Sequence, residues 1–242
     1  MGLELFLDLY SPGCRAIYIF AKKNNIPFEL RPVVLARGEH LQPEFRKVNP
    51  LGKVPALRDG DFLLAESVAI LLYLSRKYQT PDHWYPRDLQ VCARVDEYLA
   101  WQHVAIQLAA TNVYLCKSLL PHFSGQPVDA ALLERLLGKL TPGIQHLEQE
   151  VLAVRPFLAA EQISLADLMA FTELMQPTAV GCDVFRDRPY LTAWRACVEA
   201  ALGPELVQEA HELVLQPRDR RETHQDPQLV QKLVQRLRER LC

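Results

Sequence analysis

The chain has 242 residues, of which 49% are hydrophobic and 23% are charged, and its formal net charge at pH 7 is −2. This length can bury one large core or two modest ones. The slightly acidic balance gives no support for nucleic-acid binding, which favours a basic surface.

The first segment and the cysteines indicate a cytoplasmic protein. Glu4 and Asp8 interrupt the first apolar run, so we expect neither a signal peptide nor an integral membrane segment. The six cysteines, at positions 14, 92, 116, 182, 197 and 242, show neither paired spacing nor a zinc pattern. Unpaired and mostly buried cysteines are typical of a reducing compartment. We therefore expect no metal site.

The first 35 residues predict a strand, a helix and a second strand. Residues 3–9 alternate in polarity and carry four leucines on one face, which is typical of a half-buried strand. Ser11-Pro12-Gly13 forms a turn, residues 14–24 follow as a helix, and residues 28–35 form a short strand. Such an order predicts a parallel unit with a right-handed crossover.

A hairpin and a helix complete the N-terminal half. The proline of Val54-Pro55 cannot donate to a sheet ladder, which indicates a strand end and permits a cis peptide bond. Residues 56–64 predict two short strands joined at Asp59-Gly60, and a helix follows over 67–77. The order βαβ and then ββα is a thioredoxin-like α/β arrangement.

The pattern is helical from Leu89 onward, so the second half is expected to be all-α. Ser164 and Asp167 have the spacing of a capping box, and Ile163 and Leu168 that of a hydrophobic staple. The expected helices cover 89–120, 131–154 with a bend near Pro142, a helix opening at Ser164, 191–201 and 205–215. We expect domain boundaries at 1–80, a linker over 81–87, an all-helical domain over 88–225 and a last helix over 226–242.

The last helix is amphipathic. Leucines and valines share one face, and the other side is basic, following three arginines at 218, 220 and 221. The basic residues of the helix are Lys232, Arg236, Arg238 and Arg240. Docking on the rest of the chain is the simpler interpretation. A partner-binding or membrane-surface helix is the alternative.

Glu66 and Ser67 predict a small receptor for an amino acid. Ser67 stands where a helix begins, so its hydroxyl and the helix N-terminus suit a carboxylate. Glu66 beside it can accept from an ammonium group. A cis bond before Pro55 would also leave the main chain of Val54 free to pair with an extended peptide. Together these features suit the γ-glutamyl end of a peptide.

At these residues the chain resembles a known family. Lys53-Val54-Pro55, followed by Glu66-Ser67-x-Ala-Ile-Leu, is similar to the glutathione-binding half of the soluble glutathione transferases. The Met1–Leu5 opening and Ser11 resemble the theta class. The resemblance implies conjugation of glutathione to small electrophiles such as alkyl halides or epoxides, no cofactor besides the co-substrate glutathione, and a homodimer. It also implies that the last helix covers the active-site entrance.

Ser11 is the expected catalytic residue. A thiol with a pKa near ~8.5 is only a few per cent thiolate at neutral pH. A hydroxyl at a strand-to-helix turn can donate to the thiolate, and the helix N-terminus adds positive potential. Lowering the thiol pKa by about two units needs roughly 2.7 kcal/mol, which one charge-assisted hydrogen bond and a dipole can supply. The alternative is that Ser11 only caps the helix.

The resemblance implies further site residues. His40 and Lys53 would reach the glycine carboxylate of glutathione, Val54 would pair with the cysteinyl unit, and Glu66 and Ser67 would hold the γ-glutamyl end. The electrophile pocket is expected along the helix over 103–120, which holds Gln107 and no arginine. Its candidate residues are His103, Gln107, Thr111 and Tyr114.

Two other functions stay open at this stage. A scaffold of the same fold would bind glutathione without turnover. A thiol-disulfide reductase would use Cys14, since Ser11-Pro12-Gly13-Cys14 has the spacing of a Cys-x-x-Cys motif with the first cysteine replaced. Tyr10 and Pro12-Gly13 also depart from the theta pattern, and we expect Gly13 to loosen the turn that aims Ser11.

Overall fold

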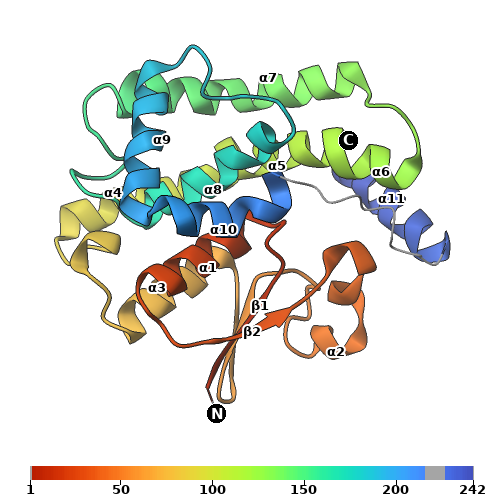
Figure 1. Ribbon diagram of the computed structural model, residues 1–242, viewed down its shortest axis with the longest axis horizontal. Coiled ribbons are helices and arrows are strands. Elements are labelled where there is room, and N and C mark those ends of the chain that lie inside the picture. Colours follow the sequence, from red (N-terminus) through yellow and green to blue (C-terminus); the bar gives the residue numbers. More distant parts are fainter. Residues whose placement is uncertain (1, 216–226, 242) are drawn as a thin grey trace.

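The computed structural model describes residues 2–215 and 227–241, and its N-terminal part is built on a four-stranded sheet (Figure 1). The strands lie in the order β2-β1-β3-β4. β1 is parallel to β2, while β3 is antiparallel to both β1 and β4. Their bounds are Leu3–Leu7 for β1, Glu29–Pro32 for β2, Ala56–Asp59 for β3 and Phe62–Ala65 for β4.

The thioredoxin-like order predicted from the sequence is confirmed. α1 (Pro12–Lys23) connects the parallel pair, a short α2 (Pro43–Arg46) precedes the hairpin, and α3 (Ser67–Lys77) follows it. The strand expected over 28–35 ends at Pro32, which has no amide hydrogen with which to continue the ladder. The predicted hairpin turns at Gly60 with a φ of 61°, and the Val54–Pro55 peptide bond is cis.

The C-terminal part is helical, as predicted. Its first helix is longer than expected and runs to Ser124. Two π-helical turns, at His103–Gln107 and Leu115–Leu119, join its three α-helical segments. These segments are α4 (Leu89–Gln102), α5 (Leu108–Tyr114) and α6 (Leu120–Ser124). The others are α7 (Ala130–His146, extended by a π-turn to Val151), α8 (Leu165–Ala179), α9 (Pro189–Leu202), α10 (Pro204–Leu215) and α11 (Pro227–Leu241).

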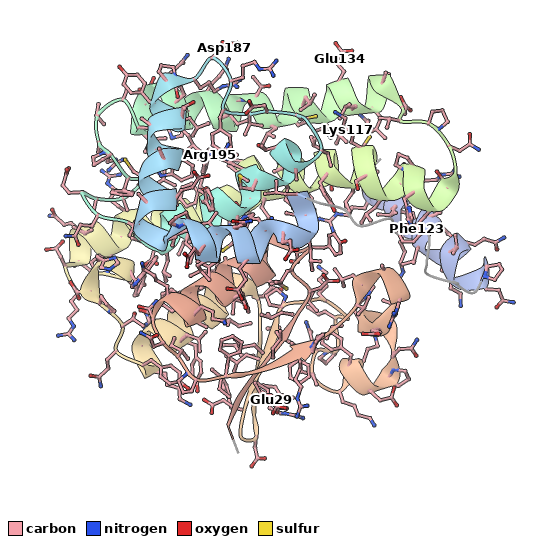
Figure 2. All side chains as sticks on the ribbon, in the orientation of Figure 1. Glu29, Lys117, Phe123, Glu134, Asp187 and Arg195 are labelled. Carbon is pink, nitrogen blue, oxygen red and sulfur yellow. The ribbon has the colours of Figure 1, made fainter. Side chains whose placement is uncertain are left out.

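The core continues from the sheet into the helices through α1 and α8. α8 is buried from Leu165 to Pro177 and packs against α1, α4 and α5. Figure 1 shows α1 between the strands at one end of the molecule and the long helices at the other. Charged side chains such as Glu29, Glu134 and Asp187 lie at its outer edges (Figure 2). No helix in the described ranges is long and apolar enough to cross a membrane.

The predicted capping box at Ser164 is confirmed. The Ser164 hydroxyl accepts from Ala166 N, and Asp167 accepts from Ser164 N at 2.9 Å. Asp167 is fully buried, and it also accepts from Leu158 N at 2.8 Å and from Trp194 Nε1 at 2.9 Å. Burial raises the pKa of Asp167, while these donors oppose the shift. One buried carboxyl therefore accepts hydrogen bonds from the start of α8, from α9 and from the loop before α8.

His211 on α10 is a buried titratable group. It is fully buried, its Nε2 has no hydrogen-bond partner among the described residues, and its Nδ1 lies 2.8 Å from Val207 O. Burial, reinforced by the charges of Arg15 and Arg195, lowers its pKa to about 3. In the unfolded chain His211 gains a proton below about pH 6.5, whereas the folded state resists it until about pH 3.

We expect the free energy of unfolding to fall by roughly 1 kcal/mol through His211 between pH 7.5 and pH 5.5. Urea denaturation at the two pH values measures this loss. His211→Gln keeps a polar side chain without titrating near neutral pH, so its unfolding free energy should change less over the same interval. An equal loss in both proteins would assign the acid sensitivity to other groups.

Candidate active site

A cavity of about 520 Å³ lies where the N-termini of α1 and α3 face α5 and α11. It is lined by the turn before α1, by residues between β2 and α2, by the loop from α2 to β3, by the start of α3, by the helix over 107–119, and by α8 and α11. Its lining residues include Tyr10, Ser11, Gly13, His40, Lys53, Val54, Glu66, Ser67, Gln107, Thr111, Tyr114, Gln176, Arg236 and Arg240.

Ser11 is the N-cap residue of α1, with extended backbone angles of φ −82° and ψ 129°. Its backbone N donates to Asp8 O at 2.9 Å, and its carbonyl accepts from Arg15 N at 3.1 Å. Its side chain makes no capping hydrogen bond to the helix. The interpretation that Ser11 only caps α1 is therefore not supported. The half-buried hydroxyl lines the cavity beside the positive end of the helix dipole.

Glu66 and Ser67 lie at the start of α3, next to the start of α1. Glu66 is exposed and has a φ of 70°, while Ser67 is buried. An added Cβ at Gly13 would lie 2.9 Å from Ser67 Cβ, so the glycine allows the two helix N-termini to meet. Gly13 is itself buried in α1. The expectation that it loosens the turn stays a prediction, and the close packing of Gly13 against Ser67 does not favour it.

The residues predicted to bind the glycine end lie on both sides of α2: His40 in a short 3-10 turn before it, and Lys53 on the loop before β3. His40 is half-buried, and its Nδ1 has no hydrogen-bond partner among the described residues. Burial, followed by the charge of Arg236, lowers the pKa of His40 to about 4, so the imidazole is neutral at pH 7. Lys53 is exposed, and its carbonyl accepts from Asn49 Nδ2 at 2.7 Å. Val54 lines the cavity beside it.

Three of the four predicted electrophile-pocket residues lie together. Gln107, Thr111 and Tyr114 line the cavity from one face of the helix at a spacing of four and three residues. His103 does not, and its inclusion was wrong. It is exposed one turn earlier, where its Nδ1 lies 2.9 Å from Gln107 Oε1. The π-helical turn between them displaces the helix face that the sequence spacing assumes.

The last helix, α11, places two arginines at the cavity, and they were not predicted from the sequence as lining residues. Arg236 and Arg240 both line it. Arg240 Nε donates to Asn112 Oδ1 at 3.1 Å, and Arg135 on α7 donates to Leu241 O at 3.2 Å. The basic side of the amphipathic last helix was the sequence feature that could have indicated these two arginines. The arginines at 218, 220 and 221 lie outside the described residues.

Cys14 is unsuited to be a nucleophile. It is completely buried, and burial raises the pKa of its thiol to about 12. The five cysteines that the structure describes are all free, and Cys197 is the exposed one among them. No group of three or more His, Cys, Asp or Glu residues in the described ranges is placed to hold a metal ion.

We expect Cys14→Ala to leave the rate of any chemistry at the cavity within about threefold of the native rate, because a buried neutral thiol contributes packing alone. Mass spectrometry after brief treatment of the folded protein with iodoacetamide should find Cys197 modified and Cys14 untouched. Rapid labelling of Cys14, together with loss of activity in Cys14→Ala, would restore the reductase interpretation.

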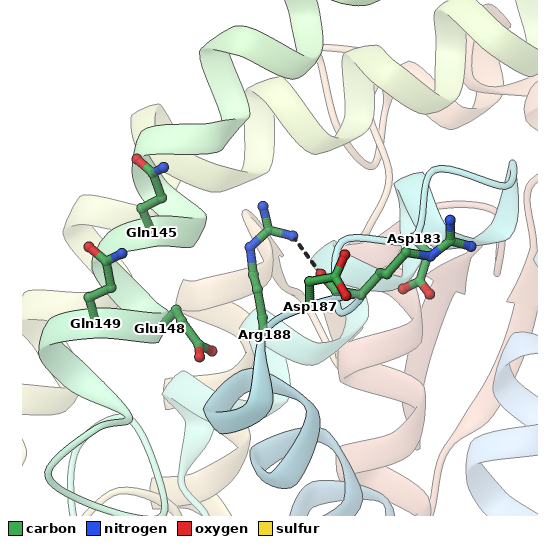
Figure 3. Close-up of a pocket in the computed structure, with 7 residues that line it drawn as sticks. Gln145, Glu148, Gln149, Asp183, Asp187 and Arg188 are labelled. Atoms are coloured by element: carbon green, nitrogen blue, oxygen red, sulfur yellow. Dashed lines mark hydrogen bonds between the residues drawn. The ribbon is translucent and has the colours of Figure 1, made fainter.

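A second cleft, of about 460 Å³, lies between α7 and the loop before α9 (Figure 3). Its polar groups serve local structure. Glu148 accepts from Tyr190 N at 3.2 Å and Leu191 N at 2.7 Å at the start of α9. Arg188 donates to Val184 O at 2.9 Å and Arg186 O at 3.4 Å. The cleft at Ser11 is therefore the better candidate for chemistry.

The chain is similar to known proteins in both sequence and structure. The family model "Glutathione S-transferase, N-terminal domain" matches residues 5–82. The chain is 58% identical to glutathione S-transferase theta-1 of Bos taurus, with 97% of each chain covered, and 56% identical to theta-3 of Mus musculus, with 96% covered. The apo structure of human glutathione S-transferase T1-1 matches with a TM-score of 0.93 and 54% identity, covering 100% of both chains. Human glutathione transferase theta-2, solved in complex with glutathione, matches with a TM-score of 0.92 and 50% identity over 98% of this chain and 99% of that one.

Proposed function

The chain belongs to the theta class of the glutathione transferases, and we propose that Ser11 is the residue that activates the glutathione thiol. The protein is an enzyme that conjugates glutathione to electrophiles, so the scaffold and reductase alternatives are not favoured. Its thioredoxin-like domain and helical domain are those of the family.

The observation that carries the proposal is the place of Ser11 at the N-cap of α1, where its side chain makes no capping hydrogen bond. Its hydroxyl lines the cavity at the N-terminus of α1 without bonding the helix backbone. A donor and a helix N-terminus that converge on one point favour an anion there. The bound thiol loses its proton to solvent, and the resulting thiolate attacks an alkyl halide. The sulfur–carbon bond forms as the carbon–halogen bond breaks, and halide leaves.

Glutathione binding is assigned to the residues beside Ser11. Ser67 and the N-terminus of α3 suit the γ-glutamyl carboxylate, and Glu66 suits its ammonium group. The backbone of Val54 would pair with the cysteinyl unit, as an added strand does. Lys53 and the neutral imidazole of His40 would contact the glycine carboxylate. Gln107, Thr111 and Tyr114 would then border the electrophile.

We assign α11 to the cavity entrance. Arg236 and Arg240 line the cavity from this helix, and Leu241 is buried against the helical domain. A docked helix that covers the entrance would exclude water from the thiolate. The proposed domain boundaries are a glutathione-binding domain over 1–80, a linker over 81–87, a helical domain over 88–225 and the covering helix over 226–242.

Dimerisation and a cytoplasmic location belong to the same proposal. Leu89, Val104 and Leu108 expose 82%, 79% and 50% of their surface along the helix that begins with α4. Exposed apolar side chains of this size suit contact with a second copy of the chain. Light scattering of the native protein and of Val104→Asp tests the assignment, since a charge in a homodimer interface should shift the mass toward that of a monomer.

The function is tested by product formation. Native protein, glutathione and benzyl chloride should give S-benzylglutathione faster than the protein-free reaction, and mass spectrometry identifies the conjugate. A small epoxide and a nitrobenzyl halide widen the search. Glutathione binding by calorimetry without acceleration for any of these electrophiles would contradict the assignment of Ser11 and favour a binding protein.

A further inference from the structure

Arg15 is a buried charged residue that has no role in the proposed steps of glutathione conjugation. It lies one helical turn after Ser11 on α1, and it is completely buried. Burial lowers its pKa to about 10, so the side chain still carries its proton at pH 7. Among the described residues, no carboxylate forms an ion pair with it. A buried cation without a counter-ion is costly to fold.

The hydrogen bonds of Arg15 are directed at the turn that holds Ser11. Nη1 donates to Leu9 O at 2.9 Å and to Tyr10 O at 3.2 Å. The Tyr10 carbonyl belongs to the peptide group that ends at the Ser11 nitrogen. The guanidinium therefore lies within one peptide group of the proposed catalytic residue.

The other end of the guanidinium fixes its position from the helical domain. Nη2 donates to Thr172 O at 2.8 Å and to Gln176 Oε1 at 2.9 Å on α8. The Gln176 amide in turn donates to Tyr10 O at 3.2 Å. Tyr10 O thus receives two donors. α8 holds Arg15 through the Thr172 carbonyl and contacts the turn directly through the Gln176 side chain, both more than 150 positions away in sequence. All these acceptors are neutral, so they bind the hydrogens of Arg15 without cancelling its charge.

Four titratable groups interact electrostatically with Arg15, and one of them is a carboxyl that opposes its charge. They come from the turn before α1, from α1 itself, from α5 and from α10: Asp8, Cys14, Tyr114 and His211. Cys14 and His211 are neutral at pH 7 because burial opposes their charged forms. Asp8 is the one carboxyl of the four, and its oxygens accept from Tyr10 N at 3.0 Å and Leu35 N at 2.9 Å.

We propose that Arg15 is a positioning residue of the transferase reaction, which fixes the Tyr10–Ser11 turn and holds a positive charge behind Ser11 that favours the bound thiolate. This inference rests on Ser11 as the activating residue. A purely structural tie between α1 and α8 would need the hydrogen bonds of Arg15 and not its charge. The two roles are separable, because a lysine keeps the charge and loses the planar fork.

The test is an ultraviolet titration of the thiolate of bound glutathione in Arg15→Gln and Arg15→Lys. We expect Arg15→Gln to raise the midpoint by about one pKa unit. A unit charge buried one helical turn from Ser11 should shift the pKa of the bound thiol by roughly this amount. Arg15→Lys should keep most of the native midpoint and lower kcat through the less constrained turn. Gln176→Met is the positional control: it removes one acceptor of Arg15 and one donor to Tyr10 O while the charge of Arg15 stays, so the midpoint should be nearly unchanged.

A second variant covers the case in which Arg15→Gln does not fold. Gln176→Glu sets a carboxylate beside Nη2 and pairs the charge of Arg15 in place, so the midpoint should rise. An unchanged midpoint in folded Gln176→Glu or Arg15→Gln that still binds glutathione overturns the proposal. If the native midpoint moves with Ser11→Ala but not with these variants, only the role of Arg15 fails. If the native midpoint equals that of free glutathione, both assignments fail.

Discussion

Replacing Ser11 with alanine is expected to lower kcat for glutathione conjugation about 10- to 100-fold. The change removes one charge-assisted hydrogen bond to the thiolate, which is worth about 1.5–3 kcal/mol. The helix N-terminus remains, so activity should fall without vanishing. Because Ser11 is not among the residues assigned to the ends of the tripeptide, the KM for glutathione should stay within about threefold. Steady-state kinetics with benzyl chloride at saturating glutathione measure both quantities.

Ser67→Ala is the matched control, since it removes a serine hydroxyl from the other helix N-terminus of the same cavity. It should raise the KM for glutathione several-fold and change kcat little, because the γ-glutamyl end is held equally before and during the reaction. The same kinetic pattern in Ser11→Ala and Ser67→Ala would contradict the division of roles between the two serines.

Replacing Asp167 with alanine is expected to lower the free energy of unfolding by about 3–5 kcal/mol. The carboxyl receives three groups of donors in a fully buried site: the backbone of Leu158, the backbone and hydroxyl of Ser164, and the indole of Trp194. Alanine would leave all of them without an acceptor and open a cavity as well. Urea denaturation at pH 7 measures the loss, which is large enough to leave the protein partly unfolded.

Asp129→Ala gives the comparison for an exposed cap. Asp129 accepts from Leu132 N at 3.0 Å at the start of α7, and water can replace it there. A loss of about 1 kcal/mol is expected. If Asp167→Ala cost no more than Asp129→Ala, the buried carboxyl would not be the fastening point between α8 and α9.

Local pattern was sufficient to predict most of the fold. Period-two leucines gave β1, Asp59-Gly60 gave the hairpin, and Ser164 with Asp167 gave the start of α8. Each of these signals is contained within a few residues, and the local geometry agrees with the global one. The two π-helical turns after α4 carry no comparable signal, so the long helix was placed correctly without its irregularities, and His103 was assigned to the wrong face.

The lining of the cavity was predictable where neighbouring residues share one motif, as Glu66 and Ser67 do. It was not predictable where tertiary contacts decide. Arg15 resembles any helical arginine in the sequence, and its burial follows from α8, which lies far along the chain. The lowered pKa of His40 likewise depends on burial and on Arg236 in the last helix. Side chains whose chemistry is set by distant partners need the structure.

The central claim is that Ser11 stabilises the thiolate of bound glutathione, and the most direct test is its ultraviolet titration in the native protein and in Ser11→Ala. We predict a native midpoint about two units below that of free glutathione, moved up by about one to two units in the variant. A native midpoint equal to that of free glutathione, or one that Ser11→Ala leaves unchanged, would contradict the account.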